Sequence, residues 1–199
     1  MQCRHAPPHL NVLGSVTEQE GSGNQVSNEE RSLFELRIAT APDALELMQQ
    51  GWPTRIISLV GDDLRFDLPC FGPHHFIARF HDVESDTEGY VAPTSAVLKA
   101  AVEHAANLEE GDRLLIHCHA GKSRSPAIAL GVLVAEGLLP GEALARVKEL
   151  RPFVIPNRLM VRMLDELLEQ NGELMRVVLE HYAGLPPEAS LPDRGGLNL

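Results

Sequence analysis

The chain has 199 residues, of which 44% are hydrophobic and 23% are charged, the balance of an ordinary globular protein with one substantial core. Its formal net charge is -11 at pH 7, so nucleic acid and anionic membranes would repel it at long range, and neither is expected as a stable partner. No apolar run approaches the ~18 residues of a membrane span, and the first ten residues lack the order of a signal peptide. A cytoplasmic location is therefore expected.

The two ends of the chain differ in composition from its middle. Residues 1–30 are rich in Gly, Ser, Asn, Gln, Pro and Glu, and the tail carries prolines and two adjacent glycines. These compositions predict a partly disordered N-terminal segment, residues 1–30, and a flexible C-terminal tail, residues 183–199. One folded domain is expected between them, over residues 31–182.

Strands and helices are predicted to alternate within this domain. Alternating or β-branched apolar residues predict strands at residues 33–39, 55–60, 75–80 and 113–117, the last of them central. Helical spacing predicts helices at residues 42–50, 93–106, 125–136, 140–150, 157–170 and 173–182. This order indicates an α/β fold with a central, mostly parallel sheet flanked by helices. The helix at 125–136 is apolar nearly all round and is expected to be buried.

The most informative segment directly follows the predicted central strand. Residues 117–126 read His-Cys-His-Ala-Gly-Lys-Ser-Arg-Ser-Pro. Cys118 and Arg124 have a Cys-x5-Arg spacing, which lets a short loop place a sulfur and a guanidinium beside one bound anion. The loop N–H groups and the positive end of the next helix converge on that anion, with Pro126 a candidate first helical residue. The segment is therefore predicted to be a phosphate-binding loop built around a nucleophile.

These residues also carry a family resemblance. The pattern His117-Cys118-x-x-Gly121-x-x-Arg124-Ser125 resembles the signature of the cysteine-based protein tyrosine phosphatase superfamily, and the short chain is most similar to its dual-specificity and bacterial tyrosine-phosphatase-like branch. Weaker matches extend the resemblance over about residues 31–182: His81-Asp82-Val83, Gly89, Ala92-Pro93, Arg151-Pro152 and Pro156-Asn157. The resemblance implies a tyrosine/dual-specificity phosphatase-like fold and a phosphomonoester hydrolase acting through a phosphocysteine intermediate.

Phosphate ester chemistry assigns a role to each residue of the loop. Helix N-termini and cationic neighbours favour the thiolate, so Cys118 is expected to attack phosphorus as an anionic sulfur. Arg124 is expected to bind two phosphate oxygens with its planar fork. Strand alternation should turn the His117 side chain away from the phosphate, toward a role in hydrogen-bonding the loop backbone. The backbone N–H groups expected to complete the cradle are those of His119, Ala120, Gly121, Lys122, Ser123 and Arg124.

Ser125 has two candidate roles that do not exclude each other. As a serine at the start of a helix, it suits the N-cap position. The family resemblance implies instead that its hydroxyl stabilises the Cys118 thiolate when water breaks the intermediate.

A leaving alkoxide or phenoxide also needs a proton from a separate, mobile loop. Asp82 is the first candidate, because it follows the strand at 75–80 and matches the His-Asp-Val position of the bacterial branch. Asp86 is the competitor, because it lies closer to the next helix, as the acid does in eukaryotic dual-specificity enzymes. One sequence does not show which carboxyl is held protonated.

The substrate is expected to be a phosphorylated protein or a small phosphate ester. Lys122 is either a solvated side chain or an extra positive charge of the kind that resembles phosphoinositide phosphatases, although His119 stands where that family has another lysine. Two rival functions remain open. One is an inactive phosphate-binding adaptor, and the other is a sulfur-transfer enzyme built on the same loop-borne cysteine. The oligomeric state is left open.

Three cysteines, Cys3, Cys70 and Cys118, form an odd count without a framework spacing, which indicates reduced thiols. Cys70 is either a lone buried thiol or the partner of Cys118 in a protective, reversible disulfide. The histidines do not form the paired Cys/His clusters of a structural zinc site, so neither a metal nor another cofactor is expected.

Overall fold

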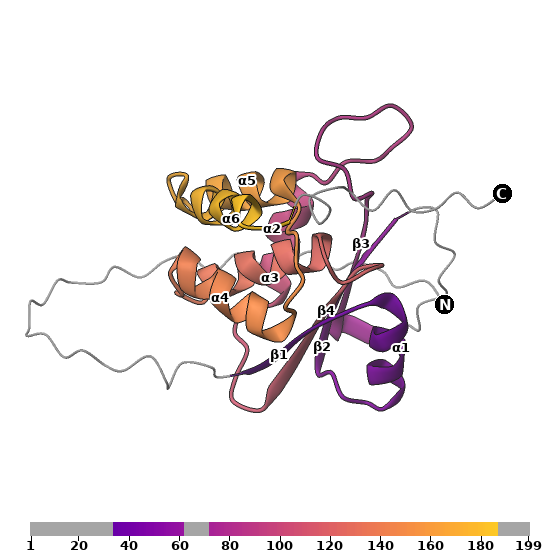
Figure 1. Ribbon diagram of the computed structural model, residues 1–199. Coiled ribbons are helices and arrows are strands. Elements are labelled where there is room, and N and C mark those ends of the chain that lie inside the picture. Colours follow the sequence, from indigo (N-terminus) through magenta and orange to yellow (C-terminus); the bar gives the residue numbers. More distant parts are fainter. Residues whose placement is uncertain (1–33, 62–71, 187–199) are drawn as a thin grey trace, which may run out of the picture.

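A computed structural model describes residues 34–61 and 72–186 of the chain (Figure 1). Its strands are β1 (Phe34–Ala39), β2 (Arg55–Val60), β3 (His75–Arg79) and β4 (Asp112–His117). They form one four-stranded sheet in the order β1-β4-β2-β3, in which every neighbouring pair is parallel. The strand that leads to Cys118 therefore has a neighbour on each side, as predicted. Parallel pairing also places the carboxyl ends of all four strands at one edge of the sheet.

Helices cover both faces of this sheet (Figure 1). On one face lies α1 (Ala41–Gln49), over a small core that includes Ala39, Met48, Ile56 and Leu115. The other face is covered by α2 (Ser95–His104), α3 (Arg124–Ala135), α4 (Pro140–Leu150), α5 (Arg158–Leu167) and α6 (Glu173–Ala183). A short 3-10 turn, Gly72–His74, precedes β3. The architecture is the predicted α/β fold.

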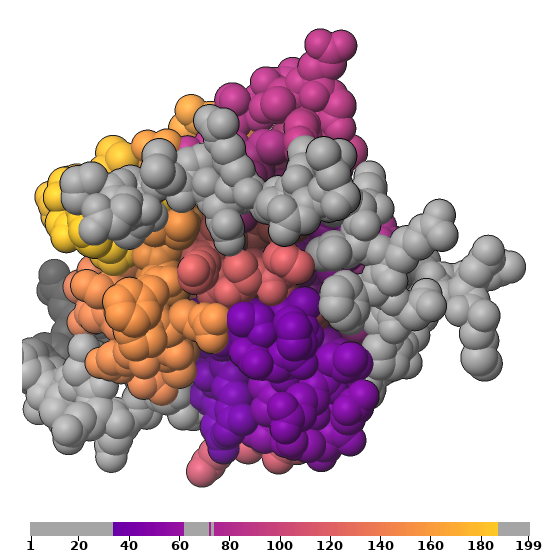
Figure 2. Space-filling model, turned by 45° about the vertical axis from the view of Figure 1, so that its right-hand side comes forward, coloured from indigo at the N-terminus to yellow at the C-terminus, as the bar shows by residue number. Residues whose placement is uncertain are grey.

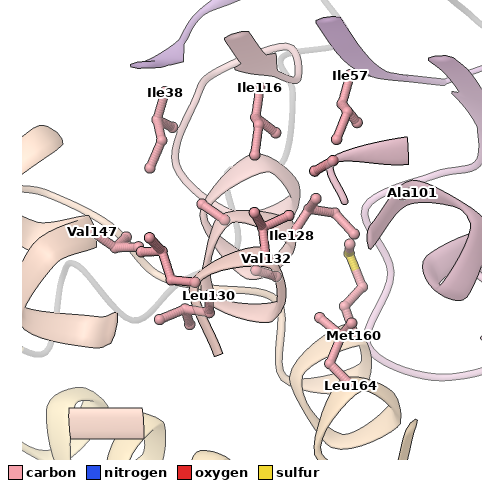
Figure 3. Packing of buried hydrophobic residues seen from close by; sticks show 14 of the residues in the cluster. Ile38, Ile57, Ala101, Ile116, Ile128, Leu130, Val132, Val147, Met160 and Leu164 are labelled. Atoms are coloured by element: carbon pink, nitrogen blue, oxygen red, sulfur yellow. The ribbon is translucent and has the colours of Figure 1, made fainter. Parts of the chain in front are cut away.

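The helix α3 is the centre of the larger core. Its residues are buried from Arg124 to Val134, because the sheet lies on one side and α2, α4 and α5 surround the rest. Figure 3 shows Ile38, Ile57 and Ile116 of the sheet facing this helix. At Gly131 an added Cβ would lie 2.8 Å from Leu164 Cδ2, so the Leu164 side chain of α5 packs directly against the backbone of α3. The phosphate loop therefore stands on a fixed, fully packed support.

The predicted elements all exist, and the differences lie at their ends. The helix predicted from residue 93 begins at Ser95, because the Thr94 hydroxyl accepts a hydrogen bond from Val97 N and caps it there. The helix α3 begins at Arg124, so Pro126 lies within its first turn and is not its first residue. The helix α6 extends to Ala183, one residue past the predicted domain boundary. The predicted disordered segment, residues 1–30, lies outside the described residues, as does the tail from residue 187.

Within the described ranges, none of the helices combines the length and the apolar character that crossing a membrane requires.

Truncation of Ile128, which is 0% exposed in α3, should measure how tightly this core is packed. We expect Ile128→Val to lower the free energy of unfolding by about 1 kcal/mol and Ile128→Ala by about 3 kcal/mol, because each lost methyl leaves a cavity. Urea unfolding followed by circular dichroism measures both. The control is Leu179→Ala, at a side chain that is 45% exposed, with little expected effect. Equal costs at the two positions would contradict a central role for α3.

Candidate active site

The loop between β4 and α3, residues 118–123, is held by bonds to its carbonyl oxygens. Four of its backbone carbonyls accept hydrogen bonds from surrounding segments. The bonds are Ala41 N to His119 O (3.0 Å), Arg151 Nη2 to Ala120 O (3.3 Å), Ile155 N to Lys122 O (2.8 Å) and Asn157 N to Ser123 O (3.2 Å). Figure 2 shows salmon atoms, the colour of this part of the chain, at the surface between the indigo-to-purple N-terminal part and orange atoms of the later chain.

Because these carbonyls point to the outside of the loop, its N–H groups are left for its inner side. The N–H groups of residues 119–124 donate to no acceptor among the described residues. Gly121 makes the turn possible: its φ is +67°, and a Cβ there would lie 2.8 Å from the carbonyl oxygen of Ala39. A row of unpaired N–H groups at a helix N-terminus is an anion-binding arrangement.

Cys118 is buried at the start of the loop, and its Sγ lies 3.2 Å from the hydroxyl of Ser125. Ser125 is the second residue of α3, so it is not the N-cap that one of its two predicted roles requires. Ser123 occupies the N-cap position, and its side chain makes no capping bond. The Ser125 hydroxyl therefore lies beside the sulfur, and Ser123 occupies the N-cap position of the helix.

Arg124 is the first residue of α3 and is 6% exposed. Its Nη1 donates to the carbonyl oxygen of Phe80 at 2.9 Å, just past the end of β3. Its Nε lies 3.8 Å from Asp82 Oδ2 and has no hydrogen-bond partner among the residues that the structure describes. A buried guanidinium is thereby fixed between the phosphate loop and the segment that carries the candidate acid.

The two candidate acids have different surroundings. Asp82 Oδ1 accepts hydrogen bonds from Ser123 Oγ and from Asn157 Nδ2, both at 2.8 Å, and its Oδ2 faces Arg124. Asp86 is exposed and makes no hydrogen bond or ion pair with a described residue. Figure 1 shows its segment projecting from the body between β3 and α2. The structure therefore brings Asp82, and not Asp86, to the phosphate loop.

His117 lies in the sheet beneath the loop and contacts β2. Its Nε2 is 2.6 Å from Ser58 Oγ, which is in turn 2.7 Å from His75 Nε2. Burial lowers the pKa of His117 to about 4, while a backbone contact with Cys118 acts in the opposite direction. Its ring is therefore neutral at pH 7. Sequence reasoning missed Ser58, because a serine in an apolar strand gives no sign of a partner 59 residues away.

The sequence offers two roles for Arg151 and Asn157, shaping the pocket or making structural hydrogen bonds. Arg151 donates to the Ala120 carbonyl, and Asn157 makes four hydrogen bonds through its N–H, Oδ1 and Nδ2, besides the bond that its carbonyl accepts within α5. The N–H of Asn157 donates to the Ser123 carbonyl, and its Oδ1 caps α5 by accepting a hydrogen bond from Met160 N. Its Nδ2 donates to Asp82 Oδ1 and to the Val83 carbonyl. An asparagine at the start of a predicted helix indicates a capping role, but it does not indicate the contacts with the acid segment.

The sequence also singled out Lys122, Cys70 and Cys3. The Lys122 side chain is exposed, and its ammonium forms no ion pair with a described residue. Cys70 and Cys3 lie outside the described ranges. Within those ranges, no group of three or more His, Cys, Asp or Glu side chains is placed to hold a metal ion.

Comparison with known proteins gives a short sequence match. Dual specificity protein phosphatase 1 of Arabidopsis thaliana is 39% identical over 59 residues, which is 29% of this chain and 30% of that protein. The match thus covers less than a third of the length of the curated relative. No family model matches the chain.

Three solved structures share the fold over most of their length. PTPMT1 in complex with PI(5)P is 16% identical, with a TM-score of 0.51 and coverage of 74% of this chain and 94% of that one. Cydia pomonella PTP-2 phosphatase is 20% identical (TM-score 0.51; 66% and 84% covered). Human tyrosine phosphatase-like serine/threonine/tyrosine-interacting protein is 23% identical (TM-score 0.50; 65% and 85% covered).

The chain therefore shares the α/β fold of these three structures, and the fold that the sequence resemblance implied is confirmed. One structure with this fold is described as a phosphatase-like interacting protein. The fold by itself is thus compatible with catalysis and with binding, and the residues of the site must distinguish the two.

Acidification should destabilise the protein through His117. Its pKa is about 4 in the folded state and 6.5 ordinarily, so between these values the unfolded chain binds a proton that the folded chain excludes. The contribution of neutral His117 to the free energy of unfolding is fully present above pH 6.5. As the pH falls to 4, this contribution should decrease by about 3 kcal/mol. Burial also lowers the pKa of His104, which adds loss of the same sign.

Urea unfolding at several pH values between 7 and 4.5 measures this loss. The variant His117→Asn should be less stable than the wild type at pH 7 and should lose less stability on acidification. Parallel pH profiles for the two proteins would contradict the assignment.

Proposed function

We propose that this protein is a metal-independent phosphomonoester hydrolase of the cysteine-based tyrosine and dual-specificity phosphatase type, acting through a phosphocysteine intermediate. One observation carries the proposal: Cys118, with the Ser125 hydroxyl beside it, begins a loop that ends at Arg124 and whose N–H groups donate to no acceptor among the described residues. A binding module needs the N–H groups and the arginine. It has no use for a buried sulfur paired with a hydroxyl donor, and this favours catalysis over an adaptor role.

In the first step, the Cys118 thiolate attacks phosphorus, and a sulfur–phosphorus bond forms as the bond to the leaving oxygen breaks. The loop N–H groups and Arg124 bind the equatorial phosphate oxygens and stabilise their charge in the transition state. Asp82 donates its proton to the leaving oxygen, so the product leaves as a neutral alcohol or phenol.

In the second step, water attacks the phosphocysteine, and Asp82, now ionised, accepts a proton from that water. The sulfur–phosphorus bond breaks and the electron pair returns to Cys118. The Ser125 hydroxyl donates a hydrogen bond to the departing thiolate, as its 3.2 Å separation from Sγ allows. Inorganic phosphate is released and the loop returns to its starting state.

The two oxygens of the Asp82 carboxyl have different contacts. Oδ1 accepts hydrogen bonds from Ser123 Oγ and Asn157 Nδ2, whereas Oδ2 lies 3.8 Å from Arg124 Nε. We infer that Oδ2 is the oxygen that transfers the proton to the leaving group, because Oδ1 is already occupied by two donors.

We propose phosphorylated protein or a small phosphate ester as the substrate class. The net charge of -11 disfavours approach to an anionic membrane surface, where a phosphoinositide would be presented. Exposed Lys122 is the feature that a second phosphate would contact, so a phosphoinositide remains the second candidate. A reducing compartment such as the cytoplasm suits a thiolate nucleophile.

Hydrolysis of p-nitrophenyl phosphate in EDTA, across pH 5 to 8, tests the reaction class. We expect the wild type to turn the ester over without metal, and Cys118→Ser to lose turnover while it retains its circular dichroism spectrum. A wild type that binds a phosphopeptide but does not hydrolyse it, with reduced thiols, would favour the adaptor. Turnover of thiosulfate above that of phosphate esters would favour sulfur transfer.

The role of the acid is tested by a matched pair, Asp82→Asn and Asp86→Asn. Asparagine keeps an Oδ1 acceptor for Ser123 and Asn157 but carries no transferable proton. We expect Asp82→Asn to lower kcat/KM for phosphotyrosine by about 10²–10⁴-fold, with Asp86→Asn close to the wild type. The opposite result would assign the proton to Asp86.

A further inference from the structure

The segment that carries Asp82 is attached to the start of α5 at three successive residues. Asn157 Nδ2 donates to the Asp82 carboxylate at 2.8 Å and to the Val83 carbonyl at 3.1 Å. The next residue of each segment continues the contact, because Arg158 Nε lies 3.0 Å from both carboxylate oxygens of Glu84, and Nη2 donates to one of them. The sequence predicts an acid on a separate, mobile loop, and in the structure the first part of this loop is hydrogen-bonded to α5.

The ion pair between Glu84 and Arg158 has further contacts at each of its two side chains. The backbone N–H of Arg158, at the N-terminus of α5, also points to Glu84 Oε1 at 3.4 Å, where the helix favours negative charge. The side-chain hydrogen bond from Arg158 lowers the pKa of Glu84, so the carboxylate stays ionised across the neutral range. On its other side, the Arg158 guanidinium lies 5.2 Å over the ring of Tyr182. The Tyr182 hydroxyl donates to the carbonyl oxygen of Pro156 at 2.9 Å.

Both side chains of this pair are partly exposed, 46% for Arg158 and 38% for Glu84. Ion pairs this accessible to solvent contribute little to overall stability. The Arg158 guanidinium nevertheless makes several bonds to the Glu84 carboxylate and packs against an aromatic ring, and these contacts together favour one local geometry. Beyond Glu84, the exposed residues 85–90 make only local hydrogen bonds within the described chain, Thr87 Oγ1 to Ser85 O and Tyr90 N to Thr87 O. The pair therefore marks the point where the fixed part of the segment ends.

We propose that Arg158 is a positioning residue for general acid catalysis: its ion pair with Glu84 holds the Asp82 carboxyl beside Arg124 and the phosphate loop before substrate arrives. This inference rests on the proposed phosphatase function. Arg158 touches no reacting atom and acts through Glu84 and the backbone between residues 82 and 84. A loop already in place needs no closing step, and the proton then lies within reach of the leaving oxygen when the phosphorus–oxygen bond breaks.

The test uses two aryl phosphates whose leaving groups differ by one nitro group and therefore in their need for a proton. Phenyl phosphate releases a strongly basic phenoxide, whereas p-nitrophenyl phosphate releases a much weaker base that departs more easily without an acid. We expect Arg158→Gln to lower kcat/KM for phenyl phosphate by about tenfold and for p-nitrophenyl phosphate by less than about twofold, because only the first reaction depends on a well-placed Asp82.

A double-mutant cycle identifies the partner. If Arg158 acts through Glu84, then Glu84→Gln, Arg158→Gln and the double variant should all lower kcat/KM for phenyl phosphate by the same factor. Arg158→Lys should recover only part of the activity, because a point charge replaces the fork. The matched control is Arg146→Gln, which removes an exposed ion pair with Glu149 on α4 and should leave both rates unchanged.

An equal loss on both substrates in Arg158→Gln would overturn the inference and indicate a general structural role. Independent, multiplicative effects of the Glu84 and Arg158 substitutions would overturn it as well. A wild type that hydrolyses neither ester would refute the proposed function itself, and the positioning role with it. Activity on both esters with no effect of Arg158→Gln on either would refute only the positioning role.

Discussion

The site depends on the outward orientation of the carbonyls in the loop after Cys118. A carbonyl left without a partner costs about 1–3 kcal/mol when it is buried, so this orientation requires donors from elsewhere in the chain. The segment from Arg151 to Asn157 supplies three of them and the start of α1 supplies the fourth. With the carbonyls satisfied on the outside, the N–H groups face the inside, where none of the described residues accepts a hydrogen bond from them. The anion site is thus a consequence of what surrounds the loop.

The buried helix α3 gives this loop its rigidity. Its first turn carries Arg124 and Ser125, and the rest of it is enclosed by the sheet and by α2, α4 and α5. Packing at this density does not permit the turn to shift relative to β4. The sulfur at the end of β4 and the guanidinium at the start of α3 therefore keep a fixed relation, as an in-line displacement requires.

The acid segment is connected to the loop through α5. The N-terminal residues of that helix, Asn157 and Arg158, contact the phosphate loop, Asp82 and Glu84 together. A single helix start thereby sets the distance between the nucleophile loop and the acid. This explains why the proline-flanked stretch before α5 carries so many of the contacts at the site.

The sequence alone determined the order of strands and helices, the parallel α/β class and the loop with Cys118 and Arg124. These follow from local patterns, the periodicity of apolar residues and the spacing within one short segment. It did not determine the role of Ser123 as N-cap, the partners of His117, or the contacts of Asn157 and Arg158 with the acid segment. Those partners lie 41 to 75 residues apart along the chain, as in the bonds of Ser123 and Asn157 to Asp82. Only tertiary packing brings such groups together, and so only the structure could distinguish the surroundings of Asp82 from those of Asp86.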